Sequence, residues 1–208
     1  MNIKILNKTV GNWKENSYCI YFDKHSILID PGDEYNVLRP AFQKLDFKFH
    51  SILLTHGHFD HIGAVHDFQS EFNVSTYLHS KDKRIANQAN LFRKFAGDNT
   101  IVKSPKIDFF IEDVSNFSVD GINIEFHHTP GHSLGSVCIE IEKNIFCGDV
   151  ILEHLIGRTD LPGGNHENLK HSINYIVDRF ENFDIYPGHG NPFVLNREAI
   201  DKFKNQLK

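Results

Sequence analysis

The chain has 208 residues, a length that suits a single domain over residues 1–208 with a full buried core. Its formal charge is −5 and its sequence pI is near 6.3, with acidic residues spread along the chain, which excludes a basic face for nucleic acid or anionic lipid. Cys19, Cys138 and Cys147 stand in apolar runs, and neither a signal peptide nor an apolar run of about 18 residues is found, so we expect a cytoplasmic protein without membrane contact.

The first half of the chain alternates strand-like and helical patterns. In order, we expect strands at 3–10, 17–22 and 27–29, a helix at 37–47, a strand at 51–54, a helix at 61–72, a strand at 75–78 and a helix at 81–96. Gly97 is the expected C-cap of the last of these helices. Residues 98–106 show no periodicity and form either a surface loop or a lid.

The second half is richer in strands. We expect a hairpin of strands 117–119 and 122–126, a second hairpin of strands 137–141 and 145–147 with Lys143-Asn144 as its turn, a glycine-rich loop at 150–164, a helix at 165–180, a strand at 185 and a closing helix around residues 200–207. Asn165 is the expected N-cap of the first of these helices. Strands alternating with helices predict an α/β fold in which helices cover the sheets.

The sequence THGHFDH at residues 55–61 directly follows an apolar strand. Alternate residues of an extended backbone point the same way, so His56 and His58 can converge on one cation. Asp60 and His61 lie beyond the bend and can serve a second cation. The alternative is that Asp60 caps a helix beginning at His61, but a cap gives no role to the three histidines.

Three further metal-binding residue types each follow a strand and stand beside glycine. They are His132 in TPGH, Asp149 in CGD and His189 in YPGHG. Neutral imidazole and carboxylate oxygen suit zinc and, less selectively, iron or manganese. Together with the residues of THGHFDH, these side chains suffice for two divalent metal ions.

The order HxHxDH, PGH, GD and PGH resembles the metallo-β-lactamase superfamily, and GDVIL followed by GRTDLPGG resembles its single-domain hydroxyacylglutathione hydrolase (glyoxalase II) type. The resemblance extends from Asn16 to Gly190. It implies an α/β fold, a four-layer αββα sandwich of two mixed sheets with helices on both outer faces. It further implies that one metal is held by His56, His58 and His132, that the second is held by Asp60, His61 and His189, and that Asp149 bridges both.

The function implied by this resemblance is hydrolysis of a small acyl thioester or ester by a hydroxide held between the two metals, with Asp60 and Asp149 as catalytic residues. An aspartate at the position of Asp30 orients a ligand histidine in this family, although Asp30 is equally well explained as a turn residue before proline. Arg158 and Asp160 are expected to form a buried ion pair that shapes their loop, or else to contact the substrate.

Other readings of the sequence remain open. Glyoxalase II enzymes carry an additional carboxy-terminal helical region that binds glutathione, and this chain leaves no room for one, so thioester hydrolysis is better supported than glutathione specificity. One alternative function is that of an iron-dependent persulfide dioxygenase, because these enzymes share the fold and the GRTD segment. A second is lactone hydrolysis, which uses the same hydroxide. A third is a non-catalytic metal-binding module that retains the ligands without activity. His127 and His128 are neighbours on a strand, so at most one of their side chains can face the metal site, and neither is assigned a role. His154, His166 and His171 are expected at the surface. No oligomeric state is predicted.

Overall fold

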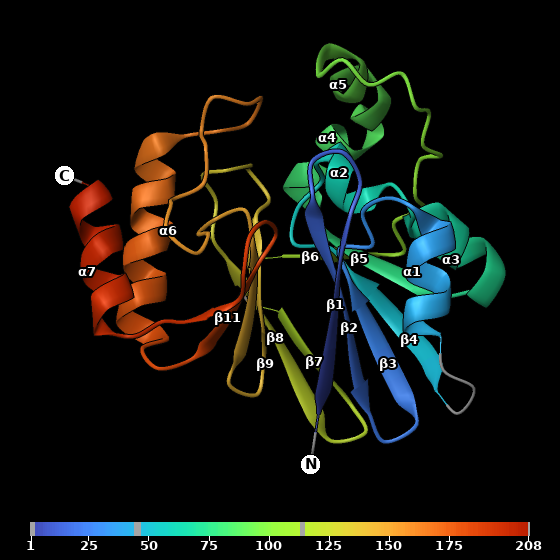
Figure 1. The fold of residues 1–208 in the computed structure, drawn as a ribbon, viewed down its shortest axis with the longest axis horizontal. Coiled ribbons are helices and arrows are strands. Elements are labelled where there is room, and N and C mark those ends of the chain that lie inside the picture. The colour runs from blue at the N-terminus through green and yellow to red at the C-terminus, as the bar shows by residue number, and fades with distance from the viewer. Residues whose placement is uncertain (1–2, 44–46, 113–114, 208) are drawn as a thin grey trace. The chain divides into compact units, whose positions relative to one another are not determined.

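The computed structural model describes residues 3–43, 47–112 and 115–207, and the chain divides into two compact units, Met1–Phe110 and Ile111–Lys208 (Figure 1). Each of its two sheets is six-stranded and mixes parallel with antiparallel pairs, which confirms the prediction of an α/β chain with two mixed sheets. None of the helices in the described ranges has the length and apolar composition needed to cross a lipid bilayer.

The strands of the first sheet lie in sequence order: β1 (Lys4–Val10), β2 (Glu15–Phe22), β3 (His25–Ile29), β4 (Lys48–Leu53), β5 (Ser75–His79) and β6 (Phe109–Ile111). Antiparallel pairing joins β1, β2 and β3, whereas β3, β4 and β5 are parallel neighbours. Because parallel strands end at the same edge of a sheet, the segments that follow β3, β4 and β5 meet there.

The helices of the first unit are α1 (Tyr35–Phe42), α2 (Phe59–Ile62), α3 (Val65–Phe72), the 3₁₀ turn η1 (Ser80–Asp82), α4 (Lys83–Asn87) and α5 (Ala89–Phe95). A single core cluster unites Leu28 and Ile52 of the sheet with Leu38 of α1 and Phe68 of α3, all of them fully buried. Removing such side chains from water is the main favourable term in folding, so this core fixes the helices against the sheet.

The second sheet has the order β12-β11-β10-β9-β8-β7, built from β7 (Ser115–Val119), β8 (Ile122–His128), β9 (Val137–Ile141), β10 (Asn144–Gly148), β11 (Asp184–Pro187) and β12 (Phe193–Val194). Since β8 and β10 are both antiparallel to β9, and β10 is parallel to β11, the segments after β8, β10 and β11 leave the same edge. The helices α6 (His166–Arg179) and α7 (Arg197–Gln206) lie side by side in Figure 1 and share a core with the sheet through Ile173 and Phe203.

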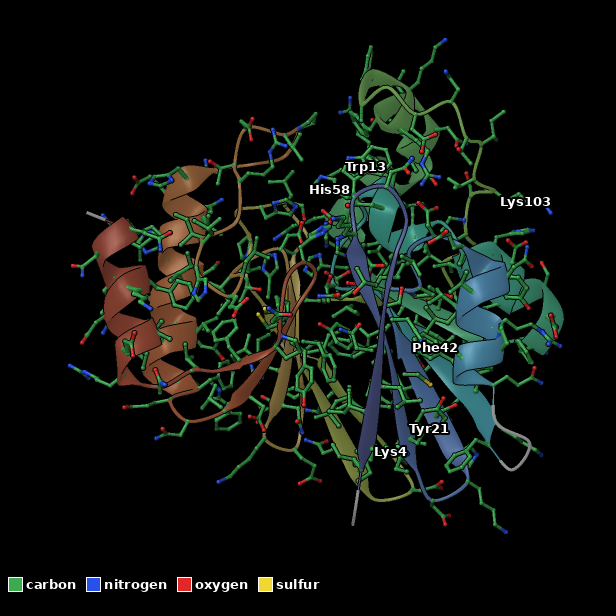
Figure 2. The ribbon with its side chains drawn as sticks, in the orientation of Figure 1. Lys4, Trp13, Tyr21, Phe42, His58 and Lys103 are labelled. Carbon is green, nitrogen blue, oxygen red and sulfur yellow. The ribbon has the colours of Figure 1, made fainter. Side chains whose placement is uncertain are left out.

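Three predicted helices are shorter or interrupted in the structure. The helix expected at 37–47 ends at Phe42, whose carbonyl accepts a hydrogen bond from the Tyr21 hydroxyl, and Gln43 is already extended (Figure 2). Residues 44–46 of that predicted helix lie outside the described residues. The helix expected at 61–72 is divided into α2 and α3, and the one expected at 81–96 into η1, α4 and α5, with Gln88 between the last two.

The hairpins follow the prediction with one shift. Asp120 and Gly121 both have positive φ, 48° and 80°, as the tight turn between β7 and β8 requires. In the second hairpin the turn is Glu142-Lys143 rather than Lys143-Asn144, because Glu142 takes the left-handed conformation, with φ 57°, and Asn144 pairs with Ile141. The strands β6 and β12 have only 3 and 2 residues and are not predicted from the sequence.

Candidate metal centre

The histidine-rich loop leaves β4 at the edge where the parallel strands of the first unit end. His58 is extended and serves as the N-cap of α2, so Asp60 and His61 lie within that helix. The alternative in which Asp60 caps a helix starting at His61 is therefore excluded. Figure 2 shows His58 at the same end of the first unit as Trp13, opposite Lys4.

Asp30 organises this loop from the end of β3. Its Oδ1 accepts the Thr55 backbone N–H at 2.8 Å, and its Oδ2 accepts the Thr55 hydroxyl at 2.5 Å and lies 2.9 Å from His61 Nδ1. Since the Thr55 hydroxyl donates to Asp30, it accepts from His56 Nδ1–H at 3.0 Å. One carboxylate thus orients His61 directly and His56 through Thr55, which supports the orienting role over that of a simple turn residue.

The imidazoles of the loop are crowded together and buried. The ring centroids of His56 and His58 are 4.7 Å apart at an interplanar angle of 90°, and those of His56 and His61 are 4.1 Å apart. His61 Nε2 lies 3.9 Å from Asp60 Oδ2. The four residues predicted from THGHFDH therefore form one cluster within the first unit.

Two buried carboxyl groups that the sequence analysis did not identify support this cluster. Asp82, fully buried at the end of η1, accepts the Gly57 N–H at 2.9 Å. Glu15, 1% exposed, places Oε1 3.9 Å from His61 Nδ1 and accepts the Ser17 hydroxyl at 2.9 Å. Burial raises the pKa of the Glu15 carboxyl well above its usual range, and the neighbouring His61 opposes this shift.

The helix α2 is held against the loop that follows β3. A Cβ at Gly32 would lie 2.1 Å from the Asp60 carbonyl, and one at Gly63 would lie 2.2 Å from the Gly32 carbonyl. Ala64 N–H donates to the Pro31 carbonyl at 3.0 Å. This close backbone approach at Gly63 is the reason that the helix predicted at 61–72 is interrupted.

A buried arginine anchors α5 next to α2. Arg93 is 1% exposed, pairs with Asp33, lies 3.3 Å from Asp98 and has its guanidinium 5.5 Å from the Phe59 ring centroid. Phe59 in turn packs edge-on against Trp13 at 4.7 Å. The segment that carries Asp60 is thereby fixed from both the β1–β2 hairpin and α5.

In the second unit, His132 lies in a loop fixed from both sides. Gly131 N–H donates to Ser133 O, and Gly131 O accepts from Asn165 N–H at 2.8 Å. Gly131 has φ 142°, and a Cβ there would lie 2.3 Å from the Leu169 backbone. His132 Nδ1 lies 2.9 Å from the Arg158 carbonyl, and only an N–H can satisfy that acceptor, so Nε2 carries the lone pair.

Asp149 lies between the two predicted histidines of the second unit. Its Oδ2 is 3.6 Å from His132 Nε2 and 3.4 Å from His189 Nε2. The loop after Asp149 folds back tightly, because a Cβ at Gly157 would lie 1.9 Å from the Asp149 carbonyl. The three residues predicted from PGH, GD and PGH therefore form a second cluster.

Arg158 and Asp160 form the predicted ion pair, but it is not buried. Arg158 Nε and Nη2 each donate to an Asp160 oxygen at 2.7 Å, and the side chains are 61% and 67% exposed. The hydrogen bonds from Arg158 hold the pKa of the Asp160 carboxyl at about 2. The prediction of burial is wrong because both residues lie on the outer side of the loop, while the Arg158 carbonyl faces His132.

The remaining predicted residues lie away from these clusters. His127 is buried against α6, His128 Nε2 lies 2.9 Å from the Leu134 carbonyl, and the three histidines expected at the surface, His154, His166 and His171, are exposed. The three cysteines are buried as expected. Burial raises the pKa of the Cys138 thiol to about 12, so it is not a nucleophile at neutral pH.

Both clusters fit a metal ion by the chemistry of their donors. His56, His61 and His132 each engage Nδ1 in a hydrogen bond, which leaves Nε2 as the donor atom, as is usual for metal-bound imidazole. Bond lengths of about 2.0–2.2 Å place neighbouring zinc ligands roughly 3.3 Å apart. The separations of 3.4 and 3.6 Å about Asp149 match this spacing.

Comparison with known proteins agrees with this reading. A profile of the metallo-β-lactamase superfamily matches residues 10–189. The hydroxyacylglutathione hydrolase GloC of Haemophilus influenzae is 34% identical, with 95% of each chain covered. Among solved structures, the BLEG-1 B3 metallo-β-lactamase has a TM-score of 0.85 at 33% identity, with 92% of this chain and 94% of that chain covered. TTHA1623, solved in a di-iron-bound form, has a TM-score of 0.83 at 31% identity, with 93% and 96% covered.

The chain has two mixed sheets with helices, and its imidazoles and carboxylates gather where strands end. This combination is that of a metal-dependent α/β hydrolase. The chain belongs to the metallo-β-lactamase superfamily, as its sequence motifs predicted.

Proposed function

We propose that this chain hydrolyses a small acyl thioester with the help of two divalent cations. The observation that carries the proposal is the common orientation of His56, His61 and His132, whose Nδ1 atoms are all hydrogen-bonded and whose Nε2 atoms are the donors. The identity to the hydroxyacylglutathione hydrolase of H. influenzae supports the substrate class. A cytoplasmic location is part of the proposal, because buried thiols suit a reducing compartment.

The proposed ligands divide between two ions and come from both units. His56, His58 and His132 would hold the first ion, Asp60, His61 and His189 would hold the second, and Asp149 would contribute to both. We propose zinc, which imidazole and carboxylate both suit. Iron uses the same donors, and the di-iron form of TTHA1623 makes it the main competitor.

Bound divalent cations lower the pKa of water from about 15.7 towards about 7 and polarise the carbonyl of an acyl group. The residues of the chain position these participants. Asp60, whose α2 segment is fixed by Gly32 and Arg93, would orient the attacking water by accepting a hydrogen bond from it. A thioester suits this arrangement because its leaving thiolate is a weak base that needs no protein acid.

A β-lactam is the second candidate substrate. The identity of 33% and TM-score of 0.85 to the BLEG-1 B3 metallo-β-lactamase favour it, and opening a lactam uses the same water and the same polarised carbonyl. The amide nitrogen that leaves is a much stronger base than a thiolate, so it requires a proton donor. This requirement ranks the lactam behind the thioester.

The test is a metal analysis joined to a substrate panel. Purified protein is assayed with a glutathione thioester, a thioester without glutathione, a lactone, a β-lactam, and glutathione persulfide with oxygen. We expect two metal ions per chain at the seven proposed ligands, fastest turnover of a thioester and loss of that turnover in Asp149→Ala. Unchanged thioester hydrolysis in Asp149→Ala, or oxygen uptake with glutathione persulfide and one iron per chain, would overturn the proposal.

A further inference from the structure

A second group of metal-ligating side chains lies within the second unit, on the face of the sheet that packs against α6. Glu125 and His127 come from β8 and Glu140 comes from β9, and one ligand atom of each lies within 4.8 Å of the others. His127 is 2% exposed, whereas the side chains of Glu125 and Glu140 are 27% and 20% exposed and reachable from solvent. This group is separate from the ligands of the proposed function.

The strand register forces two like charges together here. Glu125 is the direct cross-strand partner of Glu140, and like charges in that position destabilise a sheet. Their neighbouring cation is Arg179, whose Nη2 lies 3.7 Å from Glu125 Oε1 and whose side chain is 48% exposed. In the part of the chain that the structure describes, two carboxylates facing this one guanidinium leave a net negative charge, which favours a further cation.

The imidazole of His127 is oriented toward these carboxylates. Its Nδ1 lies 2.8 Å from the Tyr175 hydroxyl, and its Nε2 lies 2.8 Å from Glu140 Oε2 and 3.9 Å from Glu125 Oε1. These separations bracket the roughly 3.3 Å expected between neighbouring ligands of one zinc ion. Tyr175 supplies the outer hydrogen bond that fixes the ring of a metal-bound histidine.

We propose that Glu125, His127 and Glu140 bind a divalent cation of the zinc type, with the remaining position open to solvent. Binding needs the Nε2 lone pair, so the imidazole proton that Nε2 otherwise shares with Glu140 moves to Nδ1, which donates it in a hydrogen bond to the Tyr175 hydroxyl. The ion neutralises the paired carboxylates and joins β8 to β9 beneath α6. It lies outside the catalytic machinery, so its readout is metal content rather than turnover.

The test compares the wild type with Glu140→Gln after dialysis against micromolar zinc. Glutamine keeps the shape of the side chain and an acceptor for His127 but removes the anionic ligand. We expect one zinc per chain fewer in Glu140→Gln, whatever the total of the wild type. Glu167→Gln, which removes the same charge from the exposed first turn of α6, is the matched control and retains the wild-type content.

A second measurement locates the ion independently of any variant. A crystal of the wild type soaked in zinc should show an anomalous difference peak beside His127 Nε2. Equal zinc content in the wild type and a folded Glu140→Gln, judged by circular dichroism, would overturn the proposal. The absence of the anomalous peak would do the same, because the cluster would then be a proton-sharing network only.

Discussion

A single carboxylate decides how two of the proposed ligands present their donor atoms. Asp30 accepts from both groups of Thr55 and lies next to His61 Nδ1, so each of its oxygens is engaged. It holds these contacts from a left-handed backbone conformation with φ 45°, which is uncommon for a residue other than glycine. Strain of this kind persists where the surrounding contacts define the position, as at functional sites.

Replacing Asp30 by asparagine should weaken metal binding. The amide keeps an acceptor for Thr55 but lacks the charge that holds the Nδ1–H of His61, so the imidazoles lose their fixed orientation. We expect the apparent metal dissociation constant to rise about 10–100-fold. Competition with a chromophoric chelator measures it.

Asp23→Asn is the control for this substitution. Asp23 is an exposed aspartate with φ 44° in the turn between β2 and β3, so the control shares the change of charge and the left-handed backbone but lies at the opposite end of β3 from Asp30. Equal metal affinity in Asp30→Asn and Asp23→Asn would show that Asp30 is only a turn residue.

The cysteines should be inert in the native protein. Burial raises the pKa of Cys138 to about 12 and that of Cys147 well above its usual range. A raised pKa keeps a thiol protonated at pH 8, where a free cysteine is partly ionised. Ellman's reagent should therefore label the chain only after denaturation, and Cys138→Ala should retain turnover. Rapid labelling that abolishes hydrolysis would instead implicate a cysteine in the chemistry.

At the residue scale, the sequence identified the clustered histidines and aspartates but not the residues that support them. His56, His58, Asp60 and His61 were predictable because their spacing is local. The contacts of Asp82 with Gly57 and of Arg158 with His132 join residues 25 and 26 positions apart, and no local pattern encodes such pairings. Asp82 resembles an ordinary helix cap in sequence. The role of Arg158 lies in its carbonyl, which every residue has.

At the scale of elements, helix existence was predictable and helix continuity was not. The apolar stripe of residues 61–72 continues across Gly63, so the sequence predicts one continuous helix. Hydrophobic periodicity carries no information about a backbone contact from another segment of the chain. That contact is the Gly32 carbonyl, 2.2 Å from where a Cβ would be. Likewise, the short strands β6 and β12 carry too few residues for an alternation to be visible.

The loop between Asp149 and α6 depends on a glycine for the same reason. A Cβ in Gly157→Ala would lie 1.9 Å from the Asp149 carbonyl, so the backbone must move and displace Asp149 from His132 and His189. We expect a loss of about 1–3 kcal/mol in unfolding free energy and a clear fall in turnover. Urea denaturation and steady-state kinetics measure the two effects.

Gly97→Asn provides the comparison, because a Cβ at Gly97 meets no atom within 4 Å and asparagine tolerates its φ of 85°. This variant should keep both stability and turnover. A Gly157→Ala enzyme with the turnover of Gly97→Asn would show that the close approach to Asp149 has no functional consequence.

At the scale of the whole molecule, each unit has its own core and its own cluster of metal-type residues. In the proposed assignment each ion takes ligands from both units, so metal binding and the stability of the folded chain are linked. A ligand bound only by the folded state adds about 2.7 kcal/mol at one hundred times its dissociation constant. Chelation should therefore lower the melting temperature as well as abolish hydrolysis, and added metal should restore both.

Paired substitutions test whether the two units share their ions. His58→Ala and His132→Ala remove ligands proposed for the same ion, so each should lose one metal per chain, and the double variant should lose no more than either alone. His58→Ala combined with His189→Ala removes ligands from different ions and should lose both. Non-additivity of this kind marks residues that act on one centre. If the first pair also lost two metals, each unit would bind its own ion, and the shared bridging role of Asp149 would be untenable.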